Sequence, residues 1–367
     1  MEAFWEVADQ FQAFSGVDLE VELVPSSDYM AKLWTSVAAG VSPCVMELQS
    51  TQVSEFAGSG LLFPLDNFPV DNTLDGRLPG TYTYYDGWIY ALGAYDTTLV
   101  LYARASDLEA RDIRIPDADS PWSLQEFDEI LDIFSDDYDY ALDVNAGWGG
   151  EWSMFAYYPL LVSFGGDVIN QDGGRPEGVL NGMEALDWGY WFQDLFDRGL
   201  VDRNPDNYGF IEGRIPLHYS GTWDLGRYSD AYGDDLLILP PPDLGYGPHT
   251  GGGSWQWAIG SDCEYPDFAW QFIEFMMSPE SIGLVSSYTG SVPATWSGAD
   301  QTNDYADGGR WRMIMDYAWR FTVRRPAIPG YSIISQVFDS AVQGIISGED
   351  VQEALDYAVD DLTTVLE

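Results

Sequence analysis

Stretches with the period of a helix alternate with stretches with the period of a strand from the first residues onward. Apolar residues recur every three or four positions in residues 4–14 and again in 29–39, which predicts two helices. Aliphatic residues alternate with glutamates in residues 19–23, and residues 44–48 form a short apolar run, which predicts two strands. Such helix–strand alternation predicts an α/β fold with a parallel sheet.

The same reading extends along the chain. Apolar and β-branched runs predict further strands at 87–92, 98–102, 236–239 and 254–259. Helical spacing predicts helices near 53–58, after Pro121–Ser123, and at 155–164, 181–199, 268–277, 305–321 and 333–366, the last broken at Gly348. Two aromatic clusters have helical spacing and are predicted to lie in the core, Trp188/Trp191/Phe192 and Trp270/Phe272/Phe275.

Charge excludes several classes of function. The chain has 60 acidic residues against 15 Lys plus Arg, a net charge of −45, which opposes binding to nucleic acid or to an anionic bilayer. The acids are scattered, Lys32 is the only lysine, and aromatic residues make up 15%, so the chain is predicted to fold rather than to be disordered. A folded surface of carboxylates repels itself in dilute buffer, and we expect a protein from a high-salt environment.

The two cysteines, Cys44 and Cys263, lie 219 positions apart, and the only histidines that could join them are His218 and His249, so the sequence does not predict a zinc site. A disulfide and two free thiols both remain open. The chain has no stretch of about 18 apolar residues, so the sequence predicts no transmembrane helix. The first residues lack the basic start and apolar segment of a signal peptide.

Motifs of common enzyme classes are not found in the sequence. There is no phosphate-binding loop with a lysine and no Gly-x-Ser-x-Gly motif, and Gly251–Gly253 precedes a strand instead of opening a helix. Pairs of carboxylates occur by chance among 60 acids, so a glycosidase that uses two carboxylates stays an alternative.

Several motifs occur in a characteristic order. Residues 32–45 have the pattern K-L…A-A-G-x-S-P-C-V, residues 56–65 read FAGSGLLFPL, residues 210–223 run from F-I-E-G-R to G-T-W, residues 266–273 read PDFAWQFI, and residues 289–293 read TGSVP. Together with their order over nearly the whole chain, they resemble family 1 of the extracellular solute-binding proteins, the maltodextrin-binding type that serves ABC importers.

The resemblance implies an α/β fold of the periplasmic-binding-protein-like type II, with two lobes joined by a three-crossing hinge. It places the N-lobe at 1–98 plus 259–294 and the C-lobe at 99–258 plus 295–367. Ligand is then expected between the lobes, which close by hinge motion.

A sugar has apolar C–H faces and a rim of hydroxyls, and its site needs flat aromatic side chains and planar polar groups. The resemblance carries a ligand-binding role to Asp28, Tyr29, Thr51, Gln52, Asp96, Trp148, Trp152, Phe155, Trp223, Trp255, Gly253, Arg325 and Tyr331. Trp223 is expected to be the stacking platform and Asp96 the carboxylate that accepts from a hydroxyl. Arg324 competes with Arg325 for the role of the cation.

The function expected from the resemblance is that of a substrate-binding protein, not an enzyme, without a cofactor or metal. It captures a carbohydrate, an oligosaccharide in the first place, and delivers it to the permease subunits of an ABC transporter. We expect a monomer outside the cell, held at the membrane through an N-terminal segment absent from this sequence. Alternatives are a binding protein for glycerol phosphate or another polyol, and the carboxylate-based glycosidase.

Overall fold

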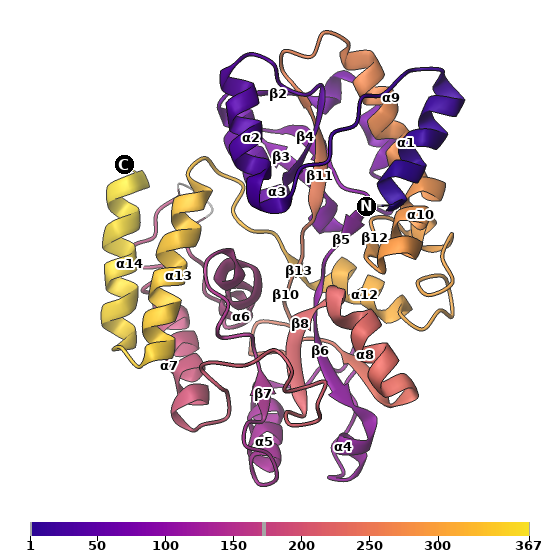
Figure 1. Ribbon diagram of the computed structural model, residues 1–367. Helices are drawn as coiled ribbons and strands as arrows, with labels where there is room; N and C mark the ends of the chain where they lie inside the picture. Colours follow the sequence, from indigo (N-terminus) through magenta and orange to yellow (C-terminus); the bar gives the residue numbers. More distant parts are fainter. Residues whose placement is uncertain (1, 171–173, 367) are drawn as a thin grey trace. The chain divides into compact units, whose positions relative to one another are not determined.

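The computed structural model describes residues 2–170 and 174–366. The chain forms two compact units (Figure 1). Unit 1 comprises Met1–Asp96, Gly253–Met315 and Pro326–Tyr331, and unit 2 comprises Thr97–Gly252, Asp316–Arg325 and Ser332–Glu367. The division expected from the sequence placed residues 295–315 in the second lobe. In the structure these residues belong to unit 1, where Thr295 forms a β-bridge with Arg77.

Unit 1 contains a five-stranded sheet whose neighbouring strands are all antiparallel. Its order is β1 (Val45–Gln49), β11 (Trp255–Gly260), β4 (Trp88–Leu92) and β3 (Tyr82–Tyr85), with β2 (Leu62–Phe63) also paired to β11. The prediction of a parallel sheet is therefore wrong for this unit, because the neighbour of β1 is a strand from far along the chain that runs in the opposite direction.

The prediction of a strand over residues 19–23 is also wrong. Residues 16–25 form neither a strand nor a helix, and Pro25 is the N-cap of the helix that follows. Val21 and Leu23 are exposed. Alternation of apolar and charged residues stabilises a strand only when one face packs on a core. Here no sheet among the described residues takes this segment as a neighbour, and of its three apolar residues only Leu19 packs, partly buried, on the core.

Helices cover the sheet of unit 1. They are α1 (Glu2–Ser15), α2 (Ser26–Ala38), α3 (Ser50–Gly58), α9 (Pro266–Met276), α10 (Pro279–Thr289) and α11 (Trp296–Ala299), and a small two-stranded sheet joins β5 (Tyr95–Asp96) to β12 (Val292–Pro293). Short 3-10 turns are η1 (Leu65–Asn67), η2 (Val70–Thr73) and η3 (Pro79–Thr81). Phe11 on α1 packs edge-on against Phe272 on α9, and Trp270 is buried in the same core, which confirms the predicted core role of Trp270 and Phe272; Phe275 is half-buried at the edge of this core.

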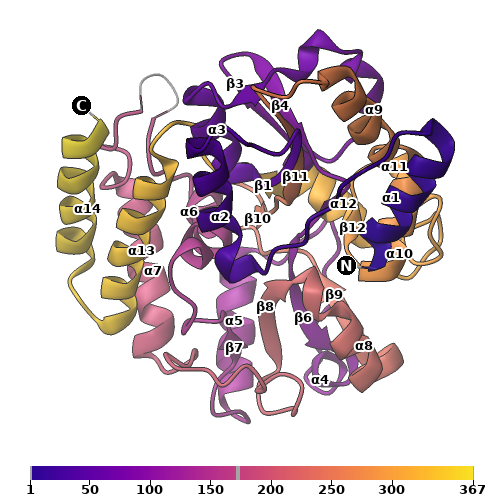
Figure 2. The same cartoon turned by 45° about the horizontal axis from the view of Figure 1, so that its top comes forward.

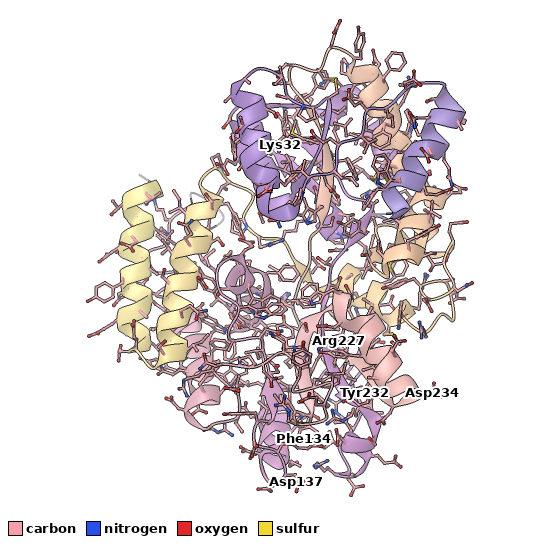
Figure 3. The ribbon with its side chains drawn as sticks, viewed as in Figure 1. Lys32, Phe134, Asp137, Arg227, Tyr232 and Asp234 are labelled. Carbon is pink, nitrogen blue, oxygen red and sulfur yellow. A yellow bond between two sulfur atoms is a disulfide. The ribbon has the colours of Figure 1, made fainter. Side chains whose placement is uncertain are left out.

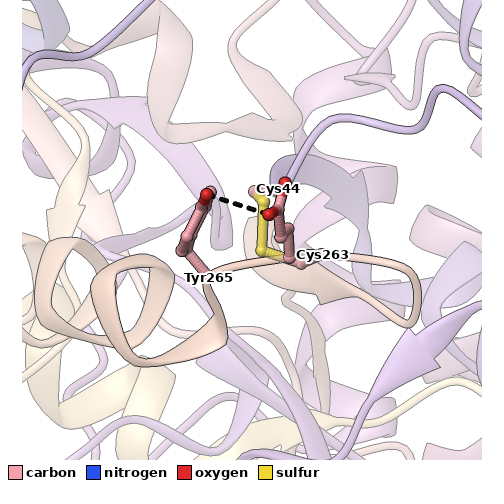
Figure 4. Close-up of a disulfide and its surroundings, with 4 residues drawn as sticks. Cys44, Cys263 and Tyr265 are labelled. Atoms are coloured by element: carbon pink, nitrogen blue, oxygen red, sulfur yellow. Dashed lines mark hydrogen bonds between the residues drawn. A yellow bond between two sulfur atoms is a disulfide. The ribbon is translucent and has the colours of Figure 1, made fainter.

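Cys44 and Cys263 form a disulfide within unit 1 (Figure 4). Cys44 directly precedes β1 and Cys263 follows β11, the strand paired with β1, so the two Cα atoms lie 4.6 Å apart. The backbone N–H of Gly260 also donates to the carbonyl of Cys44 at 3.0 Å. The question that the sequence left open is settled by the antiparallel pairing, which brings the start of one strand to the end of the other.

Unit 2 contains a four-stranded sheet with the order β7 (Leu142–Asp143), β8 (Leu217–Gly221), β6 (Leu99–Arg104) and β9 (Leu236–Leu239). Only β7 and β8 are parallel. Every residue of β6 is buried, as expected for a strand covered on both faces. A second pair joins β10 (Thr250–Gly251) to β13 (Thr322–Val323) in parallel.

Helices of unit 2 are α4 (Ala105–Glu109), α5 (Leu124–Ser135), α6 (Tyr158–Ser163), α7 (Met183–Asp197), α8 (Leu225–Tyr232), α13 (Tyr331–Ser347) and α14 (Val351–Leu366), with turns η5 (Thr222–Asp224) and η6 (Gly233–Asp235). Figures 1 and 2 show α13 and α14 side by side next to α7. Trp188 on α7 stacks on Phe192 and on Phe338 of α13, and Trp188 and Phe192 are fully buried, which confirms their predicted core role; Trp191 is only half-buried.

Two predicted helices begin later or differently than expected. The predicted helix at 155–164 opens with a π-helical turn, η4 (Ser153–Tyr157), before α6. The helix predicted from residue 305 begins only at α12 (Arg312–Phe321). Gly308 has φ 76°, a conformation that interrupts a right-handed helix, and the N–H of Trp311 turns back to the carbonyl of Asp304. Among the described residues, no helix is long and apolar enough to cross a membrane.

Candidate functional site

Four of the predicted ligand-binding residues come together in unit 2 as an aromatic cluster of Trp148, Trp152, Phe155 and Trp223. Ring centroids of Trp148 and Trp223 lie 6.4 Å apart with planes inclined by only 29°. Trp152 is edge-on to both, at 4.8 Å from Trp148 and 6.1 Å from Trp223. Phe155 lies 6.0 Å from Trp223. The sequence separates Trp223 from the other three by about seventy positions, and the fold brings them together.

The π-helical turn η4 positions two members of the cluster, Trp152 and Phe155. Trp152 precedes the turn and is only 7% exposed, and its indole N–H donates to the carbonyl of Val144 and to the hydroxyl of Tyr157. A π-helical turn inserts one residue per turn and changes the direction of the side chains that follow, a feature often found at functional sites. The hydrogen bonds of Trp152 fix its ring at the base of the cluster. Phe155 lies three positions later, within the turn itself, and is half-buried.

Trp223 is the most exposed member of the cluster, at 45%. It follows β8 in the turn η5, and its indole ring folds back over Gly221, where an added Cβ would overlap the ring. Asp224, the next residue, accepts a hydrogen bond from Ser220 at 2.8 Å. Burial is the main cause that raises the pKa of Asp224, opposed by the hydrogen bond from Ser220 and by Arg227.

Arg325 lies beside Phe155. Its guanidinium carbon is 5.1 Å from the centre of the Phe155 ring, and its Nη1 lies 2.5 Å from Glu151 Oε1. The other oxygen of Glu151 accepts from the Ser335 hydroxyl at 2.6 Å. The positive charge of Arg325 is therefore balanced by the Glu151 carboxylate next to the aromatic cluster. The guanidinium packs on the Phe155 ring as one half of an ion pair and does not offer an unbalanced positive charge to a ligand.

In unit 1, several predicted residues gather where β1 ends and β11 begins. Trp255 pairs with Gln49 across the two strands, and the N–H of Ser50 donates to the carbonyl of Ser254, which places the start of α3 next to Trp255. Thr51 and Gln52 lie in the first turn of α3. Gln52 Oε1 accepts from the Gln49 N–H at 3.2 Å, so it caps this helix.

Tyr29 on α2 completes this set from unit 1. Its ring is edge-on to Trp255 at 5.8 Å, and its hydroxyl donates to the carbonyl of Glu47 while accepting from the N–H of the same residue. Burial raises the pKa of Tyr29 to about 12, so the hydroxyl stays protonated. Asp28, also predicted, precedes it on α2 and is exposed.

Asp96 and Gly253 are brought into direct contact in unit 1. The N–H of Gly253 donates to Asp96 Oδ1 at 2.6 Å, and Asp96 is fully buried against Gly80. Gly253 has φ 133°, a conformation that side-chain-bearing residues rarely adopt. Asp96 thus orders the glycine backbone, and its predicted contact with a sugar hydroxyl stays a prediction. Tyr331 is buried at the start of α13.

No group of three or more His, Cys, Asp and Glu side chains in the described part of the chain is arranged to hold a metal ion. The buried His218 has a pKa lowered to about 3, chiefly because burial disfavours the charged imidazolium. It is therefore neutral at physiological pH, and its two ring nitrogens can only take part in neutral hydrogen bonds.

Residues around the cluster that the sequence reasoning missed are Asn207, Arg227, Asp224 and Glu151. The indole N–H of Trp148 donates to Asn207 Oδ1 at 3.0 Å, and Arg227 donates to the carbonyl of Asn207 at 2.8 Å. Nothing in the sequence links position 207 to position 148. The loop composition around Asn207 is that of many solvent-exposed turns and indicates no partner.

Solved structures identify the fold. The chain matches, over all its length and 95% of the other chain, the cyclic alpha-maltosyl-1,6-maltose binding protein from Arthrobacter globiformis, with a TM-score of 0.85 and 21% identity. It also matches the GacH receptor of Streptomyces glaucescens, over all its length and 94% of that chain, with a TM-score of 0.80 and 19% identity. The fold is thus the type II periplasmic-binding-protein fold predicted from the sequence.

The family follows from the sequence match. Residues 6–312 match the bacterial extracellular solute-binding proteins, and the chain belongs to this family. It is 25% identical over 307 residues to the maltotriose-binding protein of Pyrococcus abyssi, a match that covers 80% of this chain and 63% of that protein. The chain therefore spans less than two thirds of this relative. Members of the family are extracellular binding proteins, not enzymes.

Proposed function

We propose that this chain is the substrate-binding protein of an ABC importer and that it binds an uncharged carbohydrate, an oligosaccharide, for delivery to the membrane permease. The observation that carries the proposal is the aromatic cluster of unit 2, with Trp223 45% exposed and nearly parallel to Trp148. Flat aromatic faces bind the apolar faces of sugar rings. A relative and solved neighbours that bind maltotriose, acarbose and cyclic alpha-maltosyl-1,6-maltose support the sugar assignment.

The pairing of Arg325 with Glu151 favours a neutral ligand over glycerol phosphate. An anionic ligand at the cluster would have to separate the two side chains or accept the charge of Glu151 at close range. Like charges in a partly desolvated site cost free energy, whereas a sugar hydroxyl can share the existing hydrogen bonds without removing a charge.

Titration of the purified protein with maltotriose, in molar KCl and with calorimetric and thermal-unfolding readouts, tests the proposal. At a concentration of about a hundred times Kd, a ligand that binds only the folded state stabilises it by about 2.7 kcal/mol. We expect such stabilisation by maltotriose or by a related malto-oligosaccharide, and recovery of the sugar intact. Stabilisation by glycerol phosphate alone would support the polyol alternative, and recovery of shorter sugars would support the glycosidase.

Three finer features belong to the same proposal. The net charge of −45 supports adaptation to high salt. A monomeric state follows the function, since delivery to a permease needs one ligand-loaded chain, and light scattering after gel filtration measures it. Attachment to the membrane outside the cell stays a prediction from the family.

A further inference from the structure

A closed ring of hydrogen bonds lies beside the aromatic cluster in unit 2. It starts at Trp148, whose indole N–H donates to Asn207 Oδ1 at 3.0 Å and whose backbone N–H donates to the carbonyl of Asn145 at 2.9 Å. Trp148 is therefore held both at its backbone and at the outer edge of its ring. A tryptophan fixed at these two points has lost most of its freedom to rotate.

The inner half of the ring runs through buried side chains. Asn145 Oδ1 lies 3.2 Å from His218 Nε2, and His218 Nδ1 lies 2.7 Å from the hydroxyl of Tyr228. Because the amide nitrogen of Asn145 already donates to the carbonyl of Tyr219, its oxygen is the acceptor. His218 then donates from Nε2 and accepts from Tyr228 at Nδ1, which is a consistent arrangement for a neutral imidazole.

Arg227, labelled in Figure 3 on α8, closes the ring. Its Nη2 donates to the carbonyl of Asn207 at 2.8 Å and to the Tyr228 hydroxyl at 3.2 Å. Its Nη1 lies 3.9 Å from Asp224 Oδ1, and Asp224 directly follows Trp223 in the chain. One arginine thus connects the segment that holds Trp148 with the segment that carries Trp223.

We propose that Arg227 and Asn207 are positioning residues for carbohydrate binding: they hold Trp148 and Trp223 in their nearly parallel arrangement and do not contact the sugar themselves. The proposal rests on the carbohydrate-binding function proposed above. Since the Trp148 indole N–H is engaged by Asn207, the ring presents its face to a ligand and not its donor. A platform ordered before the ligand arrives loses less conformational entropy on binding, which increases affinity.

Asn207 permits a substitution that removes one interaction and little else. It has φ 63°, which glycine adopts without strain, so Asn207→Gly keeps the backbone and its carbonyl but removes the acceptor for the indole. Asn207→Asp restores an oxygen at the same place and tolerates the same backbone conformation. Arg227→Gln removes the second positioning residue. Arg198→Gln is the control, because Arg198 pairs with Asp132 and Asp194 at the end of α7.

Two measurements are made on each variant. Nitrogen-15 NMR of the ligand-free protein follows hydrogen exchange of the Trp148 indole N–H, assigned with Trp148→Phe, and calorimetry gives Kd for maltotriose. We expect Asn207→Gly and Arg227→Gln to exchange the indole hydrogen faster than the wild type. They should also bind maltotriose about tenfold more weakly, because one or two side chains must then be ordered on binding. Asn207→Asp and Arg198→Gln should match the wild type in both measurements.

Unchanged indole exchange in Asn207→Gly overturns the proposal, as does wild-type affinity in both positioning variants. Equal weakening by Asn207→Asp also overturns it, because the acceptor is then not what matters. The exchange measurement needs no ligand. If the wild type binds no sugar in calorimetry, the proposed function fails. The hydrogen-exchange measurement then still decides whether the ring of hydrogen bonds holds Trp148.

Discussion

The indole ring of Trp223 lies directly over Gly221, the last residue of β8, two positions before it in the chain. A Cβ at position 221 would overlap the six-membered part of the ring, so the absence of a side chain there is what allows Trp223 to fold back toward Trp148. The position of the most exposed aromatic side chain of the cluster therefore depends on a residue that offers no chemistry of its own.

Gly221→Ala should weaken maltotriose binding by about tenfold, or 1.4 kcal/mol, because the ring has to rotate away from Trp148. The overlapping atoms belong to a side chain that is free to move toward solvent, so the thermal midpoint without ligand should fall only slightly. Calorimetric titration and thermal unfolding measure the two effects. Gly226→Ala is the matched control, since a Cβ at that position on α8 meets open space; unchanged affinity in Gly221→Ala contradicts the expected role.

Trp223→Ala should reduce the affinity for maltotriose by at least about thirtyfold, or 2 kcal/mol, the range of a central aromatic contact. Because nearly half of the side chain is exposed, unfolding without ligand should change little. Trp188→Ala provides the contrast, since this buried ring should cost about 3–5 kcal/mol of folding free energy. A Trp223→Ala protein that unfolds like Trp188→Ala would show that Trp223 is a core residue.

The sequence predicted elements well where a local pattern decides them. The helix that follows Ser123 is an example: Ser123 accepts from the N–H of Glu126, and the Glu126 side chain reaches back, a reciprocal cap readable from the sequence. The strand at residues 19–23 was predicted from an equally clear pattern, and it does not form. A strand needs a neighbour from elsewhere in the chain, and local alternation carries no information about whether that neighbour exists.

The candidate site also has a part that could be predicted from the sequence and a part that could not. Trp148, Trp152, Phe155 and Trp223 were named from the family resemblance, and the structure brings them together. The hydrogen bonds that fix them involve side chains such as Asn207 and His218, whose partners lie between 10 and 73 positions away. Pairings of this kind depend on tertiary packing, so no pattern of spacing or composition reveals them.

Replacing both cysteines by serine, Cys44→Ser with Cys263→Ser, should lower the free energy of unfolding of unit 1 by about 2–5 kcal/mol, because the bridge closes a long loop of the unfolded chain. The aromatic cluster belongs to unit 2, so Kd for maltotriose should remain close to that of the wild type. Urea unfolding with and without a reductant measures the first effect, and calorimetry the second. A reductant that leaves the wild-type midpoint unchanged would contradict the predicted contribution.

Glu47 predicts a pH dependence of stability. Its carboxyl is largely buried on β1, Oε1 has no hydrogen-bond partner among the described residues, and burial raises the pKa from the ordinary 4.5 to about 7. Between these values the folded state holds a proton that the unfolded state releases, so stability falls as the pH rises from 4.5 to 7. The accumulated loss is up to about 3 kcal/mol.

Glu47→Gln has no carboxyl to ionise, so it should gain stability relative to the wild type across this window and keep a constant advantage above pH 7. Urea unfolding of both proteins at several pH values measures the difference. Glu20→Gln, at an exposed position of the same unit, should show no such trend. A difference between Glu47→Gln and the wild type that does not change with pH would mean that the carboxyl is already solvated in the folded state.

Salt should stabilise the whole protein, because acidic residues outnumber Lys plus Arg by 60 to 15 and most of their charge is unbalanced. Raising KCl from about 0.1 M to about 1 M shortens the screening length from about 10 Å to about 3 Å, which weakens repulsion between carboxylates. Exposed ion pairs such as Arg114–Glu126 are weakened too, but each contributes only about 0–1 kcal/mol. The thermal midpoint should therefore rise steeply with KCl. Sucrose strengthens burial without screening charge, so an equal rise in sucrose of the same osmolality would rule out repulsion as the cause.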